Sequence, residues 1–193
     1  MRYSDVKRKL INLFEPSKLE GKLNDEWGFL SEFDKDIQTI GYATNLSVNV
    51  VDEAARNNVD LLLTHHNVWD FMYDLKEKCA ELLKRHGIIH DWFHLPLDDA
   101  DFGTSAFLAN ALGLQETQKA NPEGIYMCSV IGKCEPSITG EYVLYSQLYA
   151  ESVGINLLAG SHTNTEIFGV EQMVLRLVTN TDIKAIRIFE ENY

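Results

Sequence analysis

The chain contains little cysteine, little proline and no long apolar run. Its 193 residues include 3 cysteines and 4 prolines. Cys79, Cys128 and Cys134 are an odd number and form no Cys-x-x-Cys pair, which argues against a disulfide framework and against a structural zinc site. We expect reduced thiols. No segment approaches the roughly 18 consecutive apolar residues of a membrane-spanning helix, so we expect no membrane partner.

Basic charge is also scarce. The sequence has 17 Lys and Arg against 29 Asp and Glu, which gives a formal net charge of -12 at pH 7. Nucleic acids are bound by concentrated basic faces, so this balance disfavours a nucleic-acid partner. The charged N-terminal residues are not followed by the apolar segment of a signal peptide, and we therefore expect a cytoplasmic protein.

Short apolar runs of strand length alternate with amphipathic segments of helical length along the whole chain. This alternation predicts an α/β fold with mainly parallel sheets. Ser4 is the expected N-cap of the first helix, and Asn45 or Ser47 that of the second. Strands are expected at 38–43, 59–66, 88–94, 125–131, 155–158 and 183–189, and further helices at 71–85, 106–112, 137–152 and 161–177.

Two stretches between these elements have the composition of loops. The segment 22–33 carries one aromatic anchor, Trp27, and 115–123 is polar throughout. The second of these loops separates two lobes in our interpretation, a first lobe at 1–114 and a second lobe at 115–193.

A pair of histidines, His65 and His66, ends the apolar run that begins at Val59. Neighbouring side chains on a strand point to opposite faces. The two imidazoles could therefore hardly bind one ion together without a bend in the chain, and could more easily serve two neighbouring ions. The alternative from the dipeptide alone is one buried, hydrogen-bonded imidazole beside one at the surface.

Further metal-type ligands follow two other predicted strands. Asp98 lies beyond the strand at 88–94, and His162 and Glu166 lie beyond the strand at 155–158. A spacing of four residues places His162 and Glu166 on one face of a helix. Imidazole and carboxylate ligands without thiolate suit iron, manganese, zinc or cobalt, and a bridging carboxylate can hold two such ions about 3.5–4 Å apart. Glu166 is our candidate bridge.

Three separated segments resemble segments of one known family. Asp60-Leu-Leu-Leu-Thr-His-His66 is similar to its Asp-apolar-apolar-Thr-His-His segment, and His94-Leu-Pro-Leu-Asp98 to its His-Thr-Asn-Leu-Asp segment. The stretch 158–169 is similar to its Gly-His-x-x-Thr-Glu-x-x-Gly segment. The family is the Nif-three-like dinuclear metal centre proteins, also described as GTP cyclohydrolase I type two homologues. The resemblance implies ligand roles for the following residues: His65, His66, Asp98, His162 and Glu166.

The resemblance also implies properties that residue patterns do not show. They are two divalent metal ions, namely iron, manganese or zinc, and a ring-like hexamer built as a trimer of dimers. The implied fold has two similar small α/β lobes, of which the second is shortened here, because a glycine-rich unit is missing between Cys134 and Gly154. A dimer is therefore the alternative assembly. His86, His90, Asp99 and Asp101 match no family ligand, and we expect them at the surface or behind the ligands.

The function that follows from the resemblance is that of a metal-dependent hydrolase. Its substrate would be small, such as a nucleotide or another phosphorylated molecule, in line with the GTP cyclohydrolase description. The alternative, from another class, is a non-catalytic metal-binding or regulatory adaptor that acts through protein partners.

Overall fold

The structure is a computed structural model. It describes the following residues: 1–14, 26–29, 33–68, 72, 74–113, 115–119, 130–133, 136–139, 148, 151–152, 156–159 and 161–190. At 115–119, 130–133, 136–139, 156–159 and 162 it describes the backbone alone. Among the described residues, no helix has the length and hydrophobicity needed to cross a membrane.

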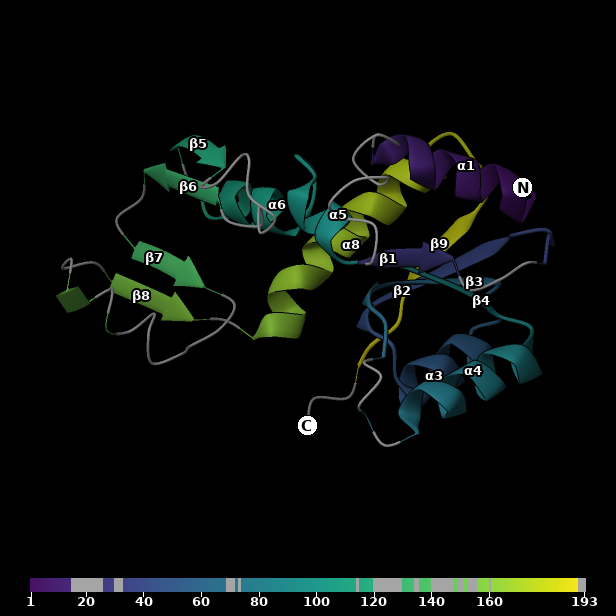
Figure 1. Cartoon of the computed structure of the whole chain (residues 1–193). Coiled ribbons are helices and arrows are strands. Elements are labelled where there is room, and N and C mark those ends of the chain that lie inside the picture. Colours follow the sequence, from purple (N-terminus) through teal and green to yellow (C-terminus); the bar gives the residue numbers. More distant parts are fainter. Residues whose placement is uncertain are drawn as a thin grey trace.

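A five-stranded sheet organises the molecule (Figure 1). Its order is β1-β4-β3-β2-β9, and the bounds are Trp27–Phe29 for β1, Thr39–Asn45 for β2, Leu61–His66 for β3, Ile89–Phe93 for β4 and Lys184–Arg187 for β9. The pairs β2–β3, β3–β4 and β2–β9 are parallel, and β1 is antiparallel to β4. The predicted α/β fold with a mainly parallel sheet is confirmed.

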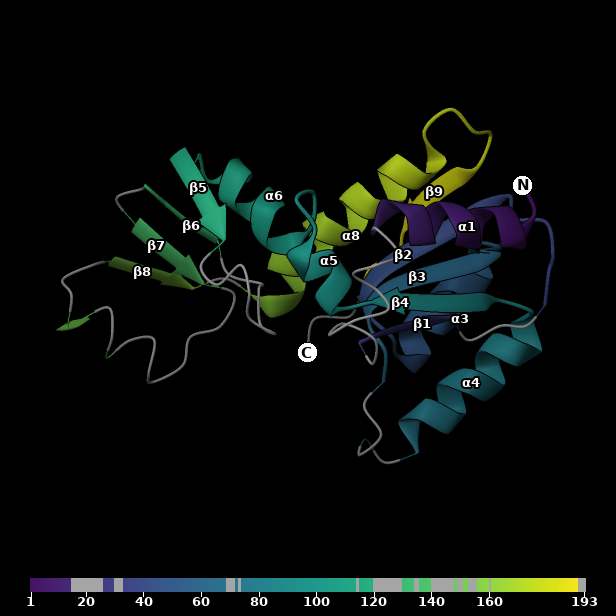
Figure 2. The same cartoon turned by 45° about the horizontal axis from the view of Figure 1, so that its top comes forward.

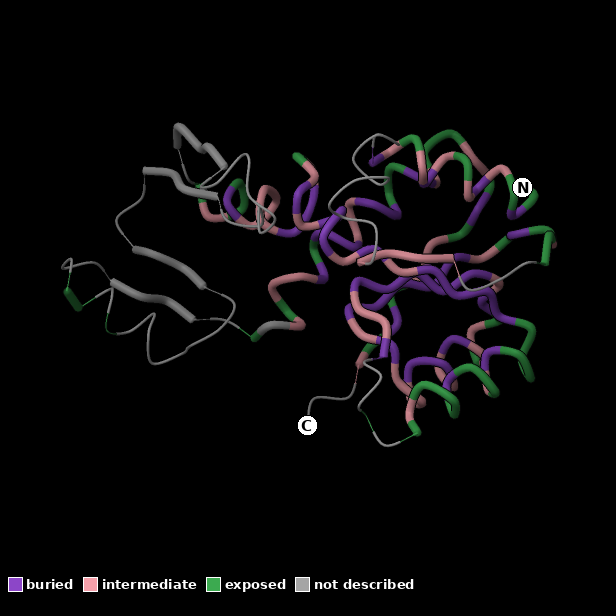
Figure 3. The backbone as a smooth tube through the Cα atoms, in the orientation of Figure 1, coloured by how far each residue is buried: buried purple, intermediate pink, exposed green. Residues whose placement is uncertain are grey.

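Helices cover both faces of this sheet, as Figures 1 and 3 show. On one face lie α1 (Tyr3–Leu13) and α8 (His162–Val178), and on the other lie α3 (Val48–Arg56) and α4 (Leu75–His86). The unbroken apolar run of β3 follows from this layering: Leu61 and Leu63 belong to the core beneath α1 and α8, whereas Leu62 belongs to the core beneath α3. The ends of β3 and β4 therefore meet at one buried edge of the sheet.

The N-termini of α1 and α3 can be compared with the N-caps expected from the sequence. The Ser47 side chain accepts a hydrogen bond from the Val50 amide, so the predicted cap of α3 is confirmed. The predicted Ser4 cap is wrong, because α1 begins at Tyr3 and the Ser4 amide donates instead to the Asp34 carboxylate, 2.9 Å away. A distant carboxylate therefore satisfies a free amide at the start of this helix.

Three local predictions are wrong in whole or in part, because pairing with distant strands decided the structure. The expected loop at 22–33 contains strand β1, which pairs with β4 and stacks Trp27 on Phe93 with 5.9 Å between the ring centroids. The expected loop at 115–123 contains β5 (Gln115–Lys119), which pairs antiparallel with β6 (Val130–Lys133). The helix expected at 137–152 is wrong at its start, which is β7 (Pro136–Thr139), parallel to β8 (Asn156–Ala159). Toward its expected end, residues 148 and 151–152 are helical. Most of 140–150 lies outside the described residues.

Strands β5 to β8 lie apart from the five-stranded sheet (Figure 2). The chain leaves the sheet through α5 (Leu95–Asp99) and α6 (Thr104–Ala111) and returns through α8 and β9. The prediction placed α8 and β9 in the second lobe, but β9 pairs with β2 and α8 packs on β2 and β3. The division of the chain at residue 114 otherwise stays a prediction.

Candidate metal centre

Imidazoles and carboxylates converge at the carboxyl edge of the parallel strands. His65 and His66 end β3, His94 directly follows β4, Asp98 lies in α5, and Glu166 lies near the start of α8. In open α/β sheets this edge is where ligands bind, because loops there carry side chains into one crevice. Two triads offer ligand atoms that all lie within 4.8 Å of one another: His65 with His66 and His94, and His65 with Asp98 and Glu166.

Each carboxylate lies between two imidazoles. Glu166 places Oε1 3.7 Å from His65 Nε2 and Oε2 3.7 Å from His66 Nε2. Asp98 places Oδ1 3.4 Å from His65 Nε2 and Oδ2 3.7 Å from His94 Nε2. His65 is thus the central imidazole, shared by both carboxylates.

The expectation that His65 and His66 point apart is wrong. Their ring centroids are 4.4 Å apart, and both imidazoles face Glu166. The pleat separates neighbouring side chains only while a strand continues, and His66 is the last residue of β3. The two histidines can therefore contribute to one site.

Hydrogen bonds on the far side of the rings orient all three histidines. Nδ1 of His65 lies 3.0 Å from the Phe93 carbonyl oxygen, Nδ1 of His66 lies 2.8 Å from Asn45 Oδ1, and Nδ1 of His94 lies 2.8 Å from Glu26 Oε2. Each partner is an acceptor, so each Nδ1 donates a hydrogen bond and each Nε2 turns toward the carboxylates. Histidines that bind metals are held in this way by a carboxylate or carbonyl behind them.

Two carboxylates that are mostly shielded from solvent face the central imidazole: Asp98 is 10% exposed and Glu166 is 18% exposed. His65 is fully buried. Burial alone would lower its pKa, but the adjacent carboxylates of Asp98 and Glu166 outweigh burial and raise the pKa of His65 to about 10. Burial would raise the pKa of Asp98, yet the adjacent His65 imidazole and the hydrogen bond from Thr104 lower it. A positive charge is therefore favoured between these carboxylates, and either a proton or a metal ion can supply it.

The residues fit a metal ion. His65 Nε2 is buried and has no hydrogen-bond partner among the described residues. Three imidazole nitrogens and two carboxylates, with no thiolate, are ligands suited to iron, manganese or zinc.

Four of the five predicted ligands lie together: His65, His66, Asp98 and Glu166. The fifth, His162, is the first residue of α8, and its side chain lies outside what the structure describes. Their role in binding metal stays a prediction. His94 was missed as a member of the cluster, although its four-residue spacing from Asp98 is the signal that pointed to His162 and Glu166.

The remaining candidates lie outside the cluster. His90 is buried and lies 2.8 Å from the Thr64 hydroxyl through Nε2, and its pKa is lowered to about 3 by burial. Asp99 is buried and Asp101 is exposed, and neither belongs to the two triads. The sequence-based placement of these groups outside the ligand set stays a prediction.

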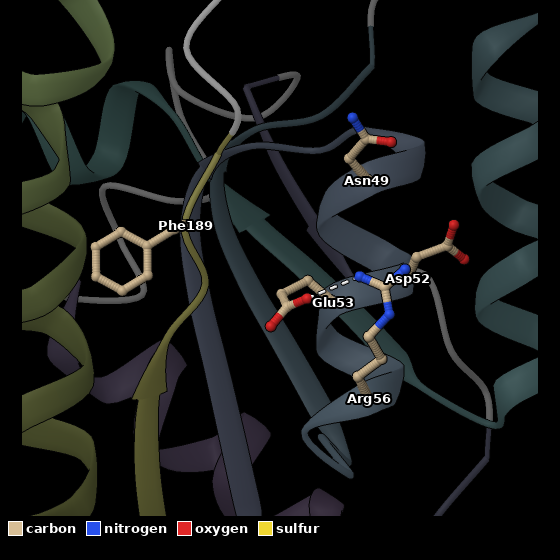
Figure 4. Close-up of a pocket in the computed structure, with 5 residues that line it drawn as sticks. All are labelled: Asn49, Asp52, Glu53, Arg56 and Phe189. Atoms are coloured by element: carbon tan, nitrogen blue, oxygen red, sulfur yellow. Dashed lines mark hydrogen bonds and ion pairs between the residues drawn. The ribbon is translucent and has the colours of Figure 1, made fainter.

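A separate surface pocket lies beside α3 (Figure 4). Its volume is about 270 Å³, and it is lined by Asn49, Asp52, Glu53, Arg56 and Phe189. Glu53 and Arg56 form an exposed ion pair at 2.9 Å. None of the lining residues belongs to the imidazole and carboxylate cluster, so this pocket is not the candidate metal centre.

Comparison with known proteins identifies the family. Residues 1–137 match the family described as Duf34/NIF3 (NGG1p interacting factor 3). The chain belongs to the NIF3 family. A "GTP cyclohydrolase 1 type 2 homolog" from Methanocaldococcus jannaschii is 24% identical over 210 residues, covering 80% of this chain and 86% of that protein. The resemblance found in the sequence is confirmed.

Solved structures show the same NIF3 fold. TTHA1606 from Thermus thermophilus superposes with a TM-score of 0.80 at 18% identity, covering 100% of this chain and 99% of its own. Reduced HcgD from Methanocaldococcus jannaschii superposes with a TM-score of 0.78 at 19% identity, covering 98% of each chain. At these identities the likeness supports the fold alone. Glu166 lies beyond the residues matched to the family, so its place in the centre rests on its geometry.

Proposed function

We propose that this NIF3-family chain holds a dinuclear metal centre and acts as a metal-dependent hydrolase on a small substrate. The observation that carries the proposal is the Glu166 carboxylate, whose two oxygens each lie 3.7 Å from a different histidine. A carboxylate placed in this way can share its oxygens between two ions. The ligands would be His65, His66, Asp98, His162 and Glu166, and the ions two divalent cations of iron, manganese or zinc.

The residues of the chain prepare the centre for this role. When bound, such a pair of ions supplies Lewis acidity and lowers the pKa of water at neutral pH. The Nδ1 hydrogen bonds of the histidines keep each Nε2 directed inward, toward the carboxylates. The Thr104 hydroxyl donates to Asp98 and holds that carboxylate between His65 and His94.

His94 is the group we place nearest the substrate. Its side chain is 33% exposed, against 0% for His65, 11% for His66 and 10% for Asp98. Glu26 fixes the ring through Nδ1, so Nε2 is oriented to accept a hydrogen bond from a substrate or to add a ligand to the centre. Glu26 reaches this position because β1 pairs with β4 and the His94 amide donates to the Glu26 carbonyl oxygen at 2.9 Å.

The substrate class follows from the chemistry and from one relative. Open positions on paired divalent ions bind phosphoryl or carbonyl oxygens. The Methanocaldococcus jannaschii relative is named a GTP cyclohydrolase 1 type 2 homolog, which makes GTP the first compound to test. Nucleotides, phosphodiesters and cyclic amides form the rest of the panel, each with manganese, zinc and ferrous iron.

A second candidate function is a metal-binding or regulatory adaptor without catalysis. By the family resemblance we expect a glycine-rich unit to be missing between Cys134 and Gly154, and this shortening modestly favours the adaptor, because such a unit could supply substrate contacts. Absence of turnover by the fully metallated protein over the whole panel would support the adaptor. Turnover that disappears in Asp98→Asn and Glu166→Gln, with folding retained, would support the hydrolase.

We propose a ring-like hexamer, a trimer of dimers, as the assembly, with a dimer as the alternative. Light scattering coupled to size exclusion distinguishes the two by mass. A monomer at micromolar concentration would contradict both assemblies.

A further inference from the structure

We infer that Glu190 is a positioning residue for His66: it fixes the orientation of the Asn45 amide and, through that amide, selects the ring nitrogen of His66 that carries the proton. The inference rests on the proposed metal centre for its importance. Its structural basis is a chain of hydrogen bonds that can be tested without metal.

Glu190 binds the end of β2 through both carboxylate oxygens. Oε1 accepts hydrogen bonds from the backbone amides of Thr44 at 2.7 Å and Asn45 at 3.1 Å. Oε2 accepts from the Asn45 side-chain nitrogen at 2.7 Å. Thr44 is fully buried, and Glu190 lies 145 residues beyond Asn45 in the sequence. The segment that follows β9 thus closes over the strand beside the histidines.

These bonds leave the Asn45 amide one orientation. An ionised carboxylate only accepts hydrogen bonds, so the Asn45 nitrogen must face Glu190. The same nitrogen also donates to the Thr163 hydroxyl oxygen at 3.2 Å, on the first turn of α8. Asn45 Oδ1 is then the atom that faces His66 Nδ1 at 2.8 Å. His66 must hold its proton on Nδ1, and Nε2 faces Glu166 Oε2 at 3.7 Å.

A carboxylate is required at position 190 because both of its oxygens accept hydrogen bonds. In Glu190→Gln, the glutamine oxygen can keep the hydrogen bonds from the backbone amides of Thr44 and Asn45. The glutamine nitrogen then faces the Asn45 side-chain nitrogen, and both nitrogens are donors. Asn45 must then turn over, so that its oxygen accepts from the glutamine and its nitrogen faces His66. Nδ1 of His66 becomes the acceptor and the proton moves to Nε2, the atom that would bind metal. Glu190→Gln is nearly isosteric, yet through two hydrogen bonds it places a proton on the His66 nitrogen that would bind metal.

A second substitution restores the pattern. In the double variant Asn45→Asp with Glu190→Gln, the new aspartate accepts from His66 Nδ1 with one oxygen and from the glutamine nitrogen with the other. The glutamine oxygen still accepts from the two backbone amides. The net charge equals that of the wild type, so the double variant separates the direction of the hydrogen bonds from the loss of charge. Glu171→Gln controls for the lost charge alone, because Glu171 lies on α8 and accepts instead from the Tyr42 hydroxyl at 2.9 Å.

The experiment measures the His66 tautomer and the zinc affinity of the full chain, with thermal unfolding as a check on folding. Nitrogen-15 spectra of the metal-free protein should show His66 protonated on Nδ1 in the wild type, on Nε2 in Glu190→Gln, and on Nδ1 again in the double variant. Zinc competition should show an affinity loss of about 10- to 100-fold in Glu190→Gln. It should also show recovery in the double variant, and little change in Glu171→Gln.

Three results would overturn the inference. They are a wild-type His66 protonated on Nε2, a Glu190→Gln protein that keeps Nδ1 protonated, and an affinity that the double variant does not restore. A wild-type His66 protonated on Nε2 overturns the inference even if a variant fails to fold. A wild type with the expected tautomer but no affinity for zinc, manganese or ferrous iron would refute the metal centre and leave the positioning role of Glu190 intact.

Discussion

Substitution of Gly169 by alanine tests how the contact between α8 and α6 supports the centre. Gly169 lies inside α8, where alanine normally stabilises a helix by about 1 kcal/mol relative to glycine. A β-carbon added here would lie 2.6 Å from the backbone nitrogen and 2.6 Å from Cγ2 of Thr104. Because one of these atoms is backbone, α6 must move away from α8. We expect overpacking to outweigh helix propensity and to lower the free energy of unfolding by about 1–3 kcal/mol.

The same displacement should reach the centre, because the Thr104 hydroxyl donates to Asp98. Gly169→Ala should therefore lower the melting temperature by about 2–12 °C and weaken zinc binding. Differential scanning calorimetry and zinc competition measure the two effects. Leu175→Ala is the matched control, since Leu175 lies on the same helix with 47% of its surface exposed and should alter stability by less than about 0.5 kcal/mol. A Gly169→Ala protein more stable than the wild type would refute the close approach of the two helices.

Four further predictions concern the centre. Glu166→Gln should weaken metal binding and abolish any turnover while the protein still folds, because one acceptor oxygen is lost; circular dichroism and zinc competition check this. Metal binding near pH 7 should release about one proton from His65, whose pKa is about 10. The metal affinity should therefore rise about tenfold per pH unit up to pH 10. Calorimetry in two buffers with different ionisation enthalpies counts the released proton, and the absence of proton release would contradict the prediction. The metal-free protein should lose stability as pH rises from about 6.5 through about 10, because the raised pKa of His65 stabilises the fold only while the imidazole is protonated. Removing the metal from a protein kept at a free metal concentration of about 100 times the Kd should lower the free energy of unfolding by about 2.7 kcal/mol. An unchanged melting temperature after chelation would count against metal binding.

The parts of the fold that the sequence predicted are those decided by local pattern or by burial on both faces. The start of β3, Leu61–Leu63, is apolar because helices cover both faces of the strand, and Ser47 caps α3 through its own side chain. Gly87 ends α4 with a positive φ of 65°, which glycine adopts without strain. Such signals lie within a few residues of the structure that they specify.

The parts that escaped prediction depend on partners distant in the sequence. β1 has three residues, and it forms because Trp27 and its neighbours pair antiparallel with the edge of β4. Glu26 reaches His94 across 68 residues, and Glu190 reaches Asn45 across 145. The four-residue spacing of His94 and Asp98 was visible in the sequence, but the direction of the His94 ring depends on Glu26. The side chains that gather at the centre could thus largely be predicted, whereas the groups that orient them could not.

Metal content is the measurement that tests the dinuclear centre most directly. The full chain is purified without chelators and without metal-affinity resin from cells grown with added iron, manganese or zinc, and its metal is quantified per chain beside Glu166→Gln. We expect about two divalent ions per wild-type chain in at least one growth condition, and fewer in the variant. A stoichiometry near zero in every growth condition would contradict the dinuclear centre.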